Sequence, residues 1–259
     1  MTTDICGASH RGNVRSHNED NIYIDGSSRS DVKMDNVFIR GKKREGIHTF
    51  AVFDGLGGES CGELASLIAA RVMREYKERG WEADTDSYIA DAHRIIIRES
   101  AKEDSGEMGT TVAAVYTEGS RATVFNVGDS RVYLYREGSL RRLTKDHSVT
   151  QTMIDGGILK EEERKNSPYE GQITQYLGMV SLEDIEPSAS VTTEALIPGD
   201  VLLLCSDGLT AELGDDDILR IIEDTSDRQA DYTVLSLVKR ATEGKCKDNV
   251  SAIICKIDS

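Results

Sequence analysis

Short runs of Val, Ile, Tyr and Thr recur along the chain, and their length is typical of β-strands. Two pairs of runs enclose a glycine-containing turn, in YTEGSRAT (116–123) and LYREGSLRRL (134–143), which is the spacing of antiparallel hairpins. The predicted strands are Asn21–Asp25, Thr49–Phe53, Thr110–Thr117, Arg121–Val127, Arg131–Arg136, Asp200–Cys205 and Val250–Ile257.

Other stretches repeat apolar residues at the period of an α-helix. The predicted helices are Ser60–Arg79, Ser87–Glu103, Asp215–Glu223 and Gln229–Glu243. In the first of them, one face carries Cys61, Ala65, Ile68, Val72 and Tyr76. Because long helices are interspersed with antiparallel hairpins, the pattern favours an α/β (α+β) fold of mainly antiparallel sheets faced by helices.

Composition favours one compact domain over residues 1–259, because no Pro-, Ser- or Gln-rich linker divides the chain. The net charge of −15 disfavours nucleic acid and anionic membranes as partners. No run of ~18 apolar residues predicts a membrane span, and the first twelve residues lack the apolar segment of a signal peptide. The five cysteines are odd in number and form no C-x-x-C pair, so we expect buried, reduced thiols and a cytoplasmic protein.

Aspartates mark the ends of several predicted strands. In an antiparallel sheet, the end of one strand lies beside the start of the next, so acids before some strands and after others can gather at one edge. A lone Asp-Gly at a strand end is usually only a turn, but five aspartates at strand ends are harder to explain as turns alone. The aspartates are Asp20, Asp54, Asp129, Asp207 and Asp248.

Carboxylates that gather in this way repel one another unless cations lie between them. Oxygen ligands without His or Cys partners select hard ions such as Mg²⁺ or Mn²⁺. The pattern therefore indicates a site for two metal ions, the arrangement that enzymes use to hydrolyse phosphate esters. The glycines at 55, 57 and 58 would let the backbone turn sharply and offer a carbonyl as a further ligand.

A dinucleotide site is the alternative interpretation of VFDGLGG (52–58). The segment Gly55–Ser60 lacks the third glycine of G-x-G-x-x-G, and Asp54 and Glu59 would both face a pyrophosphate. A serine nucleophile at Ser206 is also disfavoured, because no G-x-S-x-G motif surrounds it.

The motifs, taken in order, resemble the metal-dependent Ser/Thr protein phosphatases of the protein phosphatase 2C type, and in particular bacterial members. Nearly the whole chain takes part in the resemblance. The matching stretches are RSHNED (15–20), VFDGLGG (52–58), GTTVAAV (109–115), NVGDSRVYLYREGSLRRLTKDHS (126–148), ITQYLG (173–178), CSDGLT (205–210) and KDNVSAIIC (247–255).

The resemblance implies a four-layer αββα sandwich, in which two mainly antiparallel sheets are flanked by helix pairs. It also implies two Mn²⁺ or Mg²⁺ ions, with Asp54 bridging both and the Gly55 carbonyl ligating one. Asp207 and Asp248 would hold one ion and Asp20 the other, directly or through water. A third, weaker ion would lie at Asp129.

Further roles follow from the same resemblance. Glu19 and Asn249 would support the ligands from behind, and Arg15 would be the catalytic, phosphate-binding residue beside Asp54. The segment from about 148 to 178 matches a flap beside the active site. Gln175 stands where many relatives have Arg, so the resemblance does not assign a flap or substrate contact to this position.

The implied reaction is hydrolysis of phosphoserine and phosphothreonine on proteins by direct attack of a metal-bridging hydroxide, countering Ser/Thr kinases. Leu56 stands where eukaryotic relatives often carry the His assigned as general acid, so a metal-bound water is the expected proton donor. Of the five histidines, His93 lies within a predicted helix and is expected to be structural. We expect a monomer. The alternatives are a catalytically weak regulatory member of the same fold and a two-metal phosphodiesterase or nuclease, which the charge of −15 disfavours.

Overall fold

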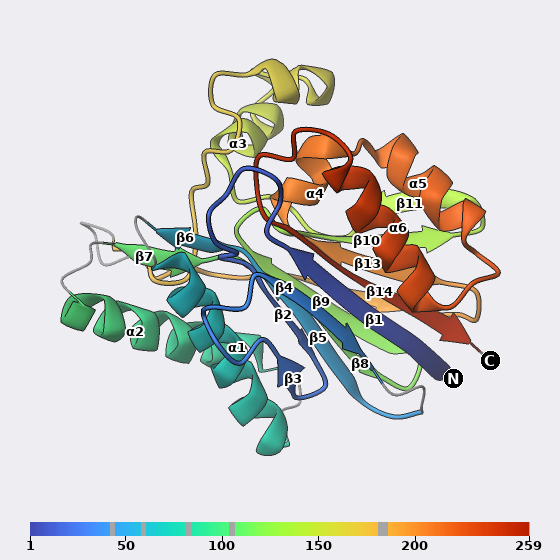
Figure 1. Cartoon of the computed structure of the whole chain (residues 1–259), viewed down its shortest axis with the longest axis horizontal. Helices are drawn as coiled ribbons and strands as arrows, with labels where there is room; N and C mark the ends of the chain where they lie inside the picture. Colours follow the sequence, from blue (N-terminus) through green and yellow to red (C-terminus); the bar gives the residue numbers. More distant parts are fainter. Residues whose placement is uncertain (42–44, 58–60, 81–83, 104–106, 181–185, 259) are drawn as a thin grey trace.

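Two six-stranded antiparallel sheets pack face to face and carry helices on their outer faces (Figure 1). The computed structural model describes residues 1–41, 45–57, 61–80, 84–103, 107–180 and 186–258. The arrangement confirms the αββα sandwich that the sequence predicts. None of the helices in these ranges is long and apolar enough to cross a membrane.

The first sheet has the strand order β11-β10-β13-β14-β1-β4. Its strands are β1 (Thr2–His10), β4 (Asn36–Arg40), β10 (Arg131–Arg136), β11 (Ser139–Arg142), β13 (Val201–Cys205) and β14 (Val250–Asp258). The second sheet has the order β12-β9-β8-β5-β2-β3. Its strands are β2 (Asn21–Ile24), β3 (Ser27–Ser28), β5 (His48–Phe53), β8 (Val112–Glu118), β9 (Arg121–Val127) and β12 (Ser190–Ala195). A small ladder of β6 (Gly55–Gly57) and β7 (Met108–Thr110) follows β5.

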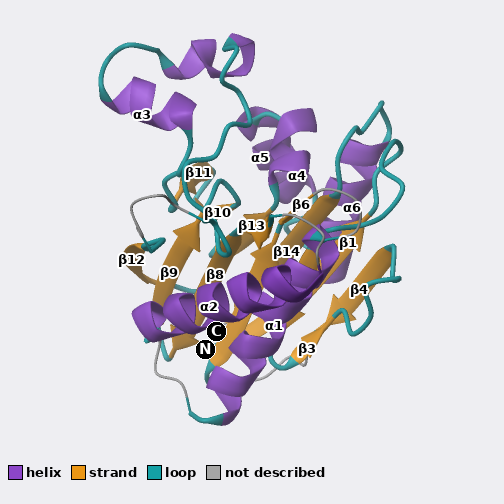
Figure 2. Cartoon of the chain, turned by 90° about the vertical axis from the view of Figure 1, so that its left-hand side faces the viewer, coloured by secondary structure: helices purple, strands orange, loops and turns teal. Residues whose placement is uncertain are grey.

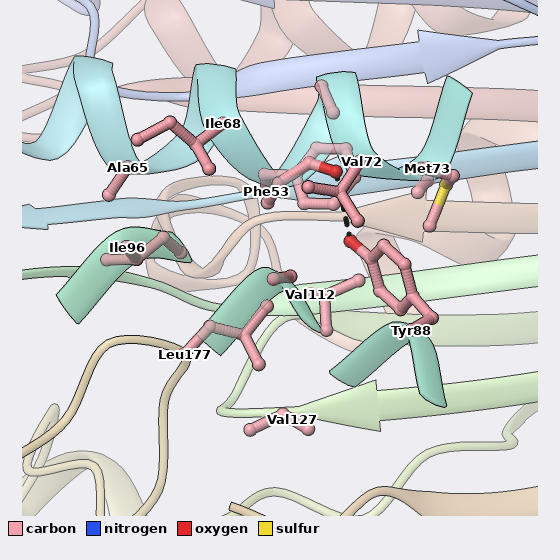
Figure 3. Close-up of a cluster of buried hydrophobic side chains, with 14 of the residues drawn as sticks. Phe53, Ala65, Ile68, Val72, Met73, Tyr88, Ile96, Val112, Val127 and Leu177 are labelled. Carbon is pink, nitrogen blue, oxygen red and sulfur yellow. Dashed lines mark hydrogen bonds between the residues drawn. The ribbon is translucent and has the colours of Figure 1, made fainter. Parts of the chain in front are cut away.

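Three apolar cores hold the four layers together. Ile22, Val115 and Ile253 belong to the core between the two sheets. The helices α1 (Gly62–Glu78) and α2 (Thr85–Glu103) cover the second sheet, and their contact is shown in Figure 3. The helices α4 (Asp207–Glu212), α5 (Asp215–Asp224) and α6 (Ala230–Thr242) cover the first sheet. The sandwich is therefore packed on both faces of both sheets.

Most predicted elements are present, with ends shifted by a few residues. Ser60, the predicted start of α1, lies outside the described residues. The prediction of one strand over Thr110–Thr117 is wrong at Thr111, where the chain passes from β7 to β8. Strands β1, β4 and β12 were not predicted, because their many polar residues obscure the strand pattern; β1 is moreover buried on both faces and has no alternation. Figure 2 shows β4 at the open edge of its sheet.

The segment after His147 leaves the sandwich and returns to it (Figure 1). It contains α3 (Val149–Asp155) and the 3₁₀ turn η1 (Glu161–Asn166). Its two ends meet, because the Val149 amide donates to the Gln172 carbonyl at 2.8 Å and the Thr174 amide to the His147 carbonyl at 2.7 Å. We refer to residues 148–178 as the flap segment.

Candidate metal centre

The strand pairing brings the five aspartates to one end of the sandwich. β2 begins where β5 ends, so Asp20 and Asp54 are neighbours. β13 ends beside the start of β14, which makes Asp207 and Asp248 neighbours in the other sheet. Asp129 lies in the turn that joins β9 of one sheet to β10 of the other. The prediction of a shared acidic edge is confirmed, and we call it the acidic edge.

Asp20 is buried at the junction of the two sheets, with 1% of its surface exposed. Its Oδ2 accepts hydrogen bonds from Ser206 Oγ at 2.8 Å and Ser251 Oγ at 2.7 Å. Its Oδ1 is buried and has no hydrogen-bond partner among the described residues. One carboxylate oxygen thus ties the sheets together, while the other has unused bonding capacity.

The backbone at Asp54 is held by the two threonines of the GTT motif. The Asp54 amide donates to Thr111 Oγ1 at 3.1 Å, and the Asp54 carbonyl accepts from Thr110 Oγ1 and the Thr111 amide at 2.9 Å each. A side chain at Gly55 would collide with the carbonyl oxygens of Glu19 and Gly62. The turn after β5 therefore needs glycine at 55. Gly58 of the same motif lies outside the described residues.

Asp207 and Asp248 are brought together by a close approach of their backbones. A Cβ on Gly208 would strike the carbonyl oxygen of Asn249, so only glycine permits the contact. Asp207 is the first residue of α4, and Asp248 precedes β14 by two residues. The Asn249 amide donates to Asp248 Oδ1 at 2.9 Å, which fixes one of its oxygens.

Asp129 borders a cavity of about 790 Å³ between the flap segment and α4. Asp207 lines the same cavity, together with Arg164 of the flap segment and Thr210 of α4. The neighbouring Ser130 Oγ lies 2.7 Å from Thr111 Oγ1, which links this turn to the backbone of Asp54. The cavity gives the acidic edge an opening beside the flap segment.

The carboxyl groups of the acidic edge destabilise one another's charged forms. The pKa of Asp20 is raised to about 7, mainly by burial; the hydrogen bonds from Ser251 and Ser206 lower it, and the charges of Asp248 and Asp207 raise it. Burial also raises the pKa of Asp54 well above its usual range, followed by the charges of Asp20, Asp207, Asp248 and Asp129. The edge therefore carries more negative charge than its surroundings neutralise.

The donor set fits hard divalent cations. Every candidate side-chain ligand is a carboxylate, the Asp20 Oδ1 atom is buried and unpartnered, and Asp207 lies within hydrogen-bonding reach of Asp54. Two carboxyl groups in such contact need a proton or a cation between them. Within the described ranges, no three His, Cys, Asp or Glu side chains already stand at the distances of a finished metal site. The residues fit the ions in charge and donor chemistry, and their role as ligands stays a prediction.

Arg15 lies beside the acidic edge on the loop that leads to Asp20. Its Nη2 donates to Asp248 Oδ2 at 2.9 Å, and its Nη1 lies 3.9 Å from Glu19 Oε2. Its side chain is 47% exposed, so it can exchange these partners for a ligand from solution. Burial raises the pKa of Glu19 to about 7, and Glu63 raises it while Arg15 lowers it.

Asn249 holds this loop in place, and its support of metal ligands stays a prediction. Its Oδ1 accepts from the Glu19 amide at 2.8 Å. Its Nδ2 donates to the carbonyls of Arg11 at 2.8 Å and His17 at 3.0 Å. The side chain thus fixes both ends of the segment that carries Arg15.

Sequence reasoning missed the hydroxyl groups around the aspartates. Ser206 is buried and donates to Asp20, which gives it a supporting role and agrees with its rejection as a nucleophile. Ser251 and Thr111 have similar roles, and both lie within stretches of the family resemblance, KDNVSAIIC and GTTVAAV, from which no role was predicted for these hydroxyl groups. Their signal in the sequence is a hydroxyl residue within or beside a buried strand.

The remaining site residues lie near the edge without joining it. Leu56 is half-buried in β6 and pairs with Gly109 of β7. Gln175 Oε1 accepts from the Ser188 amide at 3.0 Å. His93 is buried, and its Nδ1 accepts from the Gly178 amide at 3.1 Å, as expected of a structural histidine. All five cysteine side chains are buried.

Known proteins match this chain in sequence over most of its length. The chain is 31% identical over 254 residues to the serine/threonine protein phosphatase PstP of Mycobacterium tuberculosis. The aligned region covers 96% of this chain and 44% of that protein. It thus spans less than half of that relative. It is 28% identical over 266 residues to the serine/threonine phosphatase stp of Listeria monocytogenes, covering 96% of this chain and 93% of that protein.

Solved structures agree with the fold. A crystal structure of M. tuberculosis PstP matches with a TM-score of 0.82 at 28% identity and covers 100% of both chains. The catalytic domain of PstP in complex with two manganese ions matches with a TM-score of 0.77 at 28% identity, covering 99% of this chain and 100% of that one. A sequence model described as protein phosphatase 2C matches residues 27–240. The chain belongs to the protein phosphatase 2C family.

Proposed function

We propose that this protein is a metal-dependent phosphatase that hydrolyses phosphoserine and phosphothreonine on proteins. The observation that carries the proposal is the convergence of five aspartates, from both sheets, at one edge with Arg15 beside them. Two Mn²⁺ or Mg²⁺ ions would be held by Asp20, Asp54, Asp207, Asp248 and the Gly55 carbonyl, and a third at Asp129. The names of the PstP and stp relatives support the substrate class.

The wider setting is part of the same proposal. The enzyme counters a Ser/Thr kinase in the cytoplasm and acts as a monomer. Residues 1–259 form one catalytic domain, and the flap segment is its subdomain beside the active site. The contact of the flap segment with the cavity at Asp129 and Asp207 supports this assignment.

When bound, Mn²⁺ or Mg²⁺ would supply positive charge for the phosphoryl oxygens and would bring the pKa of an attacking water toward neutrality. The aspartates hold that charge at the sheet edge, and Asp20 is anchored by Ser206 and Ser251. The Arg15 guanidinium would exchange its hydrogen bond with Asp248 for hydrogen bonds to the phosphoryl oxygens. Its planar shape lets it donate to two oxygens at once. Direct hydrolysis without a phospho-enzyme is favoured because the Ser206 hydroxyl is buried and already bonded.

The test is release of phosphate from phosphothreonine, phosphoserine and phosphotyrosine peptides with and without Mn²⁺, with Asp54→Asn as the control. We expect Mn²⁺-dependent turnover of the first two peptides, abolished in the variant. Turnover that needs no metal, or that the variant retains, would contradict the proposal. Hydrolysis of a phosphodiester instead of the peptides would favour a nuclease.

Leu56 leaves the departing serine or threonine oxygen without a side-chain proton donor at this position. A substrate with a good leaving group, such as an aryl phosphate, has little need of that proton. We therefore expect Leu56→His to raise kcat on a phosphopeptide by about 10²-fold, the lower end of the range for general acid catalysis, and to change aryl phosphate hydrolysis little. An equal change on both substrates would show that this position does not limit protonation.

A further inference from the structure

Arg29 is the largest side chain that the sandwich buries completely, with 1% of its surface exposed. It follows the short strand β3 and points inward rather than to solvent. Among the described residues, it forms no ion pair, and its Nε atom has no hydrogen-bond partner. A buried guanidinium is unfavourable unless the surrounding groups stabilise it, so its environment calls for an explanation.

The guanidinium joins two segments that border the acidic edge. Its Nη1 donates to the carbonyl of Asn18, two residues before Asp20. Its Nη2 donates to the Glu63 carbonyl and to Ser66 Oγ in the first turns of α1, at 3.3 Å each. The planar fork thus spans the gap between the loop and the helix, which a single-headed side chain cannot do.

Ser66 extends this bridge to the next residue of the loop. Its Oγ donates to the Glu19 carbonyl at 2.6 Å. Arg29 and Ser66 therefore hold the carbonyls of Asn18 and Glu19, which fix the position of the backbone that enters Asp20. Asn249 holds the same loop from the opposite side through the Glu19 amide.

The charge of Arg29 acts in the same place. Burial lowers the pKa of Arg29, and the carboxylates that oppose this most strongly are Asp20 and Glu63. Both carboxylates are buried, and each has one oxygen without a partner among the described residues. A fixed cation behind them reduces their repulsion without occupying the oxygens that would face a metal ion.

We propose that Arg29 is a positioning residue for the metal centre, which holds the Asn18–Asp20 backbone against α1 and offsets the charge of Asp20 and Glu63. This inference rests on the proposed function, because it concerns the ion at Asp20. Residues that orient metal ligands from behind typically contribute 10–100-fold in metal affinity. Arg29 would thus support metal binding without touching the metal or the substrate.

The test is the affinity of the metal-free protein for Mn²⁺, measured by isothermal titration calorimetry, for the wild type, Arg29→Met, Arg29→Lys and Ser66→Ala. We expect Arg29→Met to weaken Mn²⁺ binding by about 10-fold or more. Arg29→Lys keeps the charge but not the fork, so it should recover only part of the loss. Ser66→Ala should weaken binding by a smaller factor, about threefold, because one hydrogen bond to Glu19 is removed.

The matched control is Arg74→Met, on α1, the helix that also carries Ser66. Arg74 donates to Ser28 Oγ at 2.9 Å, beside Arg29 in the chain, and among the described residues no hydrogen bond or ion pair joins it to the Asn18–Asp20 loop. The melting temperature of the Arg74→Met variant in EDTA measures the loss of stability caused by removing a guanidinium from this region. The Mn²⁺ affinity of this variant should equal that of the wild type.

The outcomes separate the two proposals. Wild-type Mn²⁺ affinity in a folded Arg29→Met protein, or an equal loss in Arg74→Met, would overturn the role of Arg29 alone. If Arg29→Met does not fold, Ser66→Ala decides: weaker binding supports the role, and unchanged binding overturns it. Failure of the wild type to bind Mn²⁺ would overturn both proposals.

Discussion

The strand β2 has an aspartate at each end, and the two carboxyl groups have opposite environments. At one end, Asp20 is buried with other aspartates and has an unpartnered oxygen. At the other end, Asp25 Oδ2 lies 2.6 Å from His48 Nδ1, and Asp25 Oδ1 accepts from Lys77 Nζ at 2.6 Å. Burial alone would raise the pKa of Asp25, but the bonds from His48, Lys77 and the Thr49 amide bring it well below its usual range.

The comparison separates a structural carboxylate from a functional one. Asp25 is matched by partners that the fold supplies, so its charge stabilises the native state. The charge of Asp20 is opposed by Asp248 and Asp207, so its charge needs a partner from outside the chain. Burial by itself does not distinguish the two positions, whereas the balance of nearby charges does.

The largest expected effect is on activity at the acidic edge. Asp54→Asn removes a carboxylate that four others destabilise, so kcat on a phosphothreonine peptide should fall by a factor on the order of 10³ or more. The metal-free protein should melt at a higher temperature than the wild type, because the repulsion is relieved. Calorimetry in EDTA and phosphate release with Mn²⁺ measure the two changes. A lower melting temperature would show that Asp54 is held by the fold as Asp25 is.

The reverse is expected at the other end of β2. Asp25→Asn leaves His48 and Lys77 without their shared carboxylate, and breaking a buried charge pair of this kind costs about 3 kcal/mol. Urea denaturation measures the loss. Activity of the folded variant, assayed well below its melting temperature, should stay within about twofold of the wild type, since Asp25 lies at the far end of the strand. A selective loss of Mn²⁺ affinity would contradict the distinction.

The two ends should also differ in how pH changes stability. The pKa of Asp20 is about 7 in the folded protein and 3.8 ordinarily, so the native state binds more protons than the unfolded chain between these values. The stability of the metal-free protein should therefore fall by a few kcal/mol as pH rises from about 4 to 7. Asp25 has a lowered pKa, so its contribution is constant in this window and is lost only at lower pH.

Melting temperatures in EDTA between pH 5 and 8 test this dependence. Asp20→Asn should flatten the curve, whereas Asp25→Asn should shift it down without changing its slope. Saturating Mn²⁺ should remove the fall, and an ion present at 100 times its Kd would add about 2.7 kcal/mol. A stability that rises with pH in EDTA would refute the assignment of repulsion to the acidic edge.

A smaller effect is expected at Arg15, a cation that contacts the acidic edge from solvent. Arg15→Lys keeps a positive charge near Asp248 but loses the fork, so kcat/KM on a phosphopeptide should fall by about 10- to 100-fold. Mn²⁺ affinity should change little, because Arg15 touches Asp248 through an oxygen that solvent also reaches. Steady-state kinetics measure the change in kcat/KM, and calorimetric titration measures the change in Mn²⁺ affinity. Loss of Mn²⁺ binding in this variant would make Arg15 part of the metal centre.

The sequence predicts the aspartates well because each follows or precedes an apolar strand, and the pairing of strands converts that pattern into proximity. It also predicts Asn249 through the motif that surrounds Asp248. It does not predict Arg29, because nothing in the local pattern of SSRSD distinguishes a buried arginine from a surface one. Nor does it predict β4, whose exposed Asn36 and Phe38 obscure its alternation. These features depend on contacts between segments far apart in the chain.

Within the flap segment, residues 149–172 leave the sandwich and return to it beside the bridge between Ser148 and Ile173, whereas Leu177 pairs with Thr110 and packs in the core. No strand of the described sheets lies within the flap segment. An exchange of residues 149–172 would therefore leave the strand pairing of both sheets and the five aspartates of the acidic edge in place. For protein engineering, the residues between Ser148 and Ile173 could thus be replaced as a unit. Such a replacement would change one wall of the cavity and keep the five aspartates of the acidic edge.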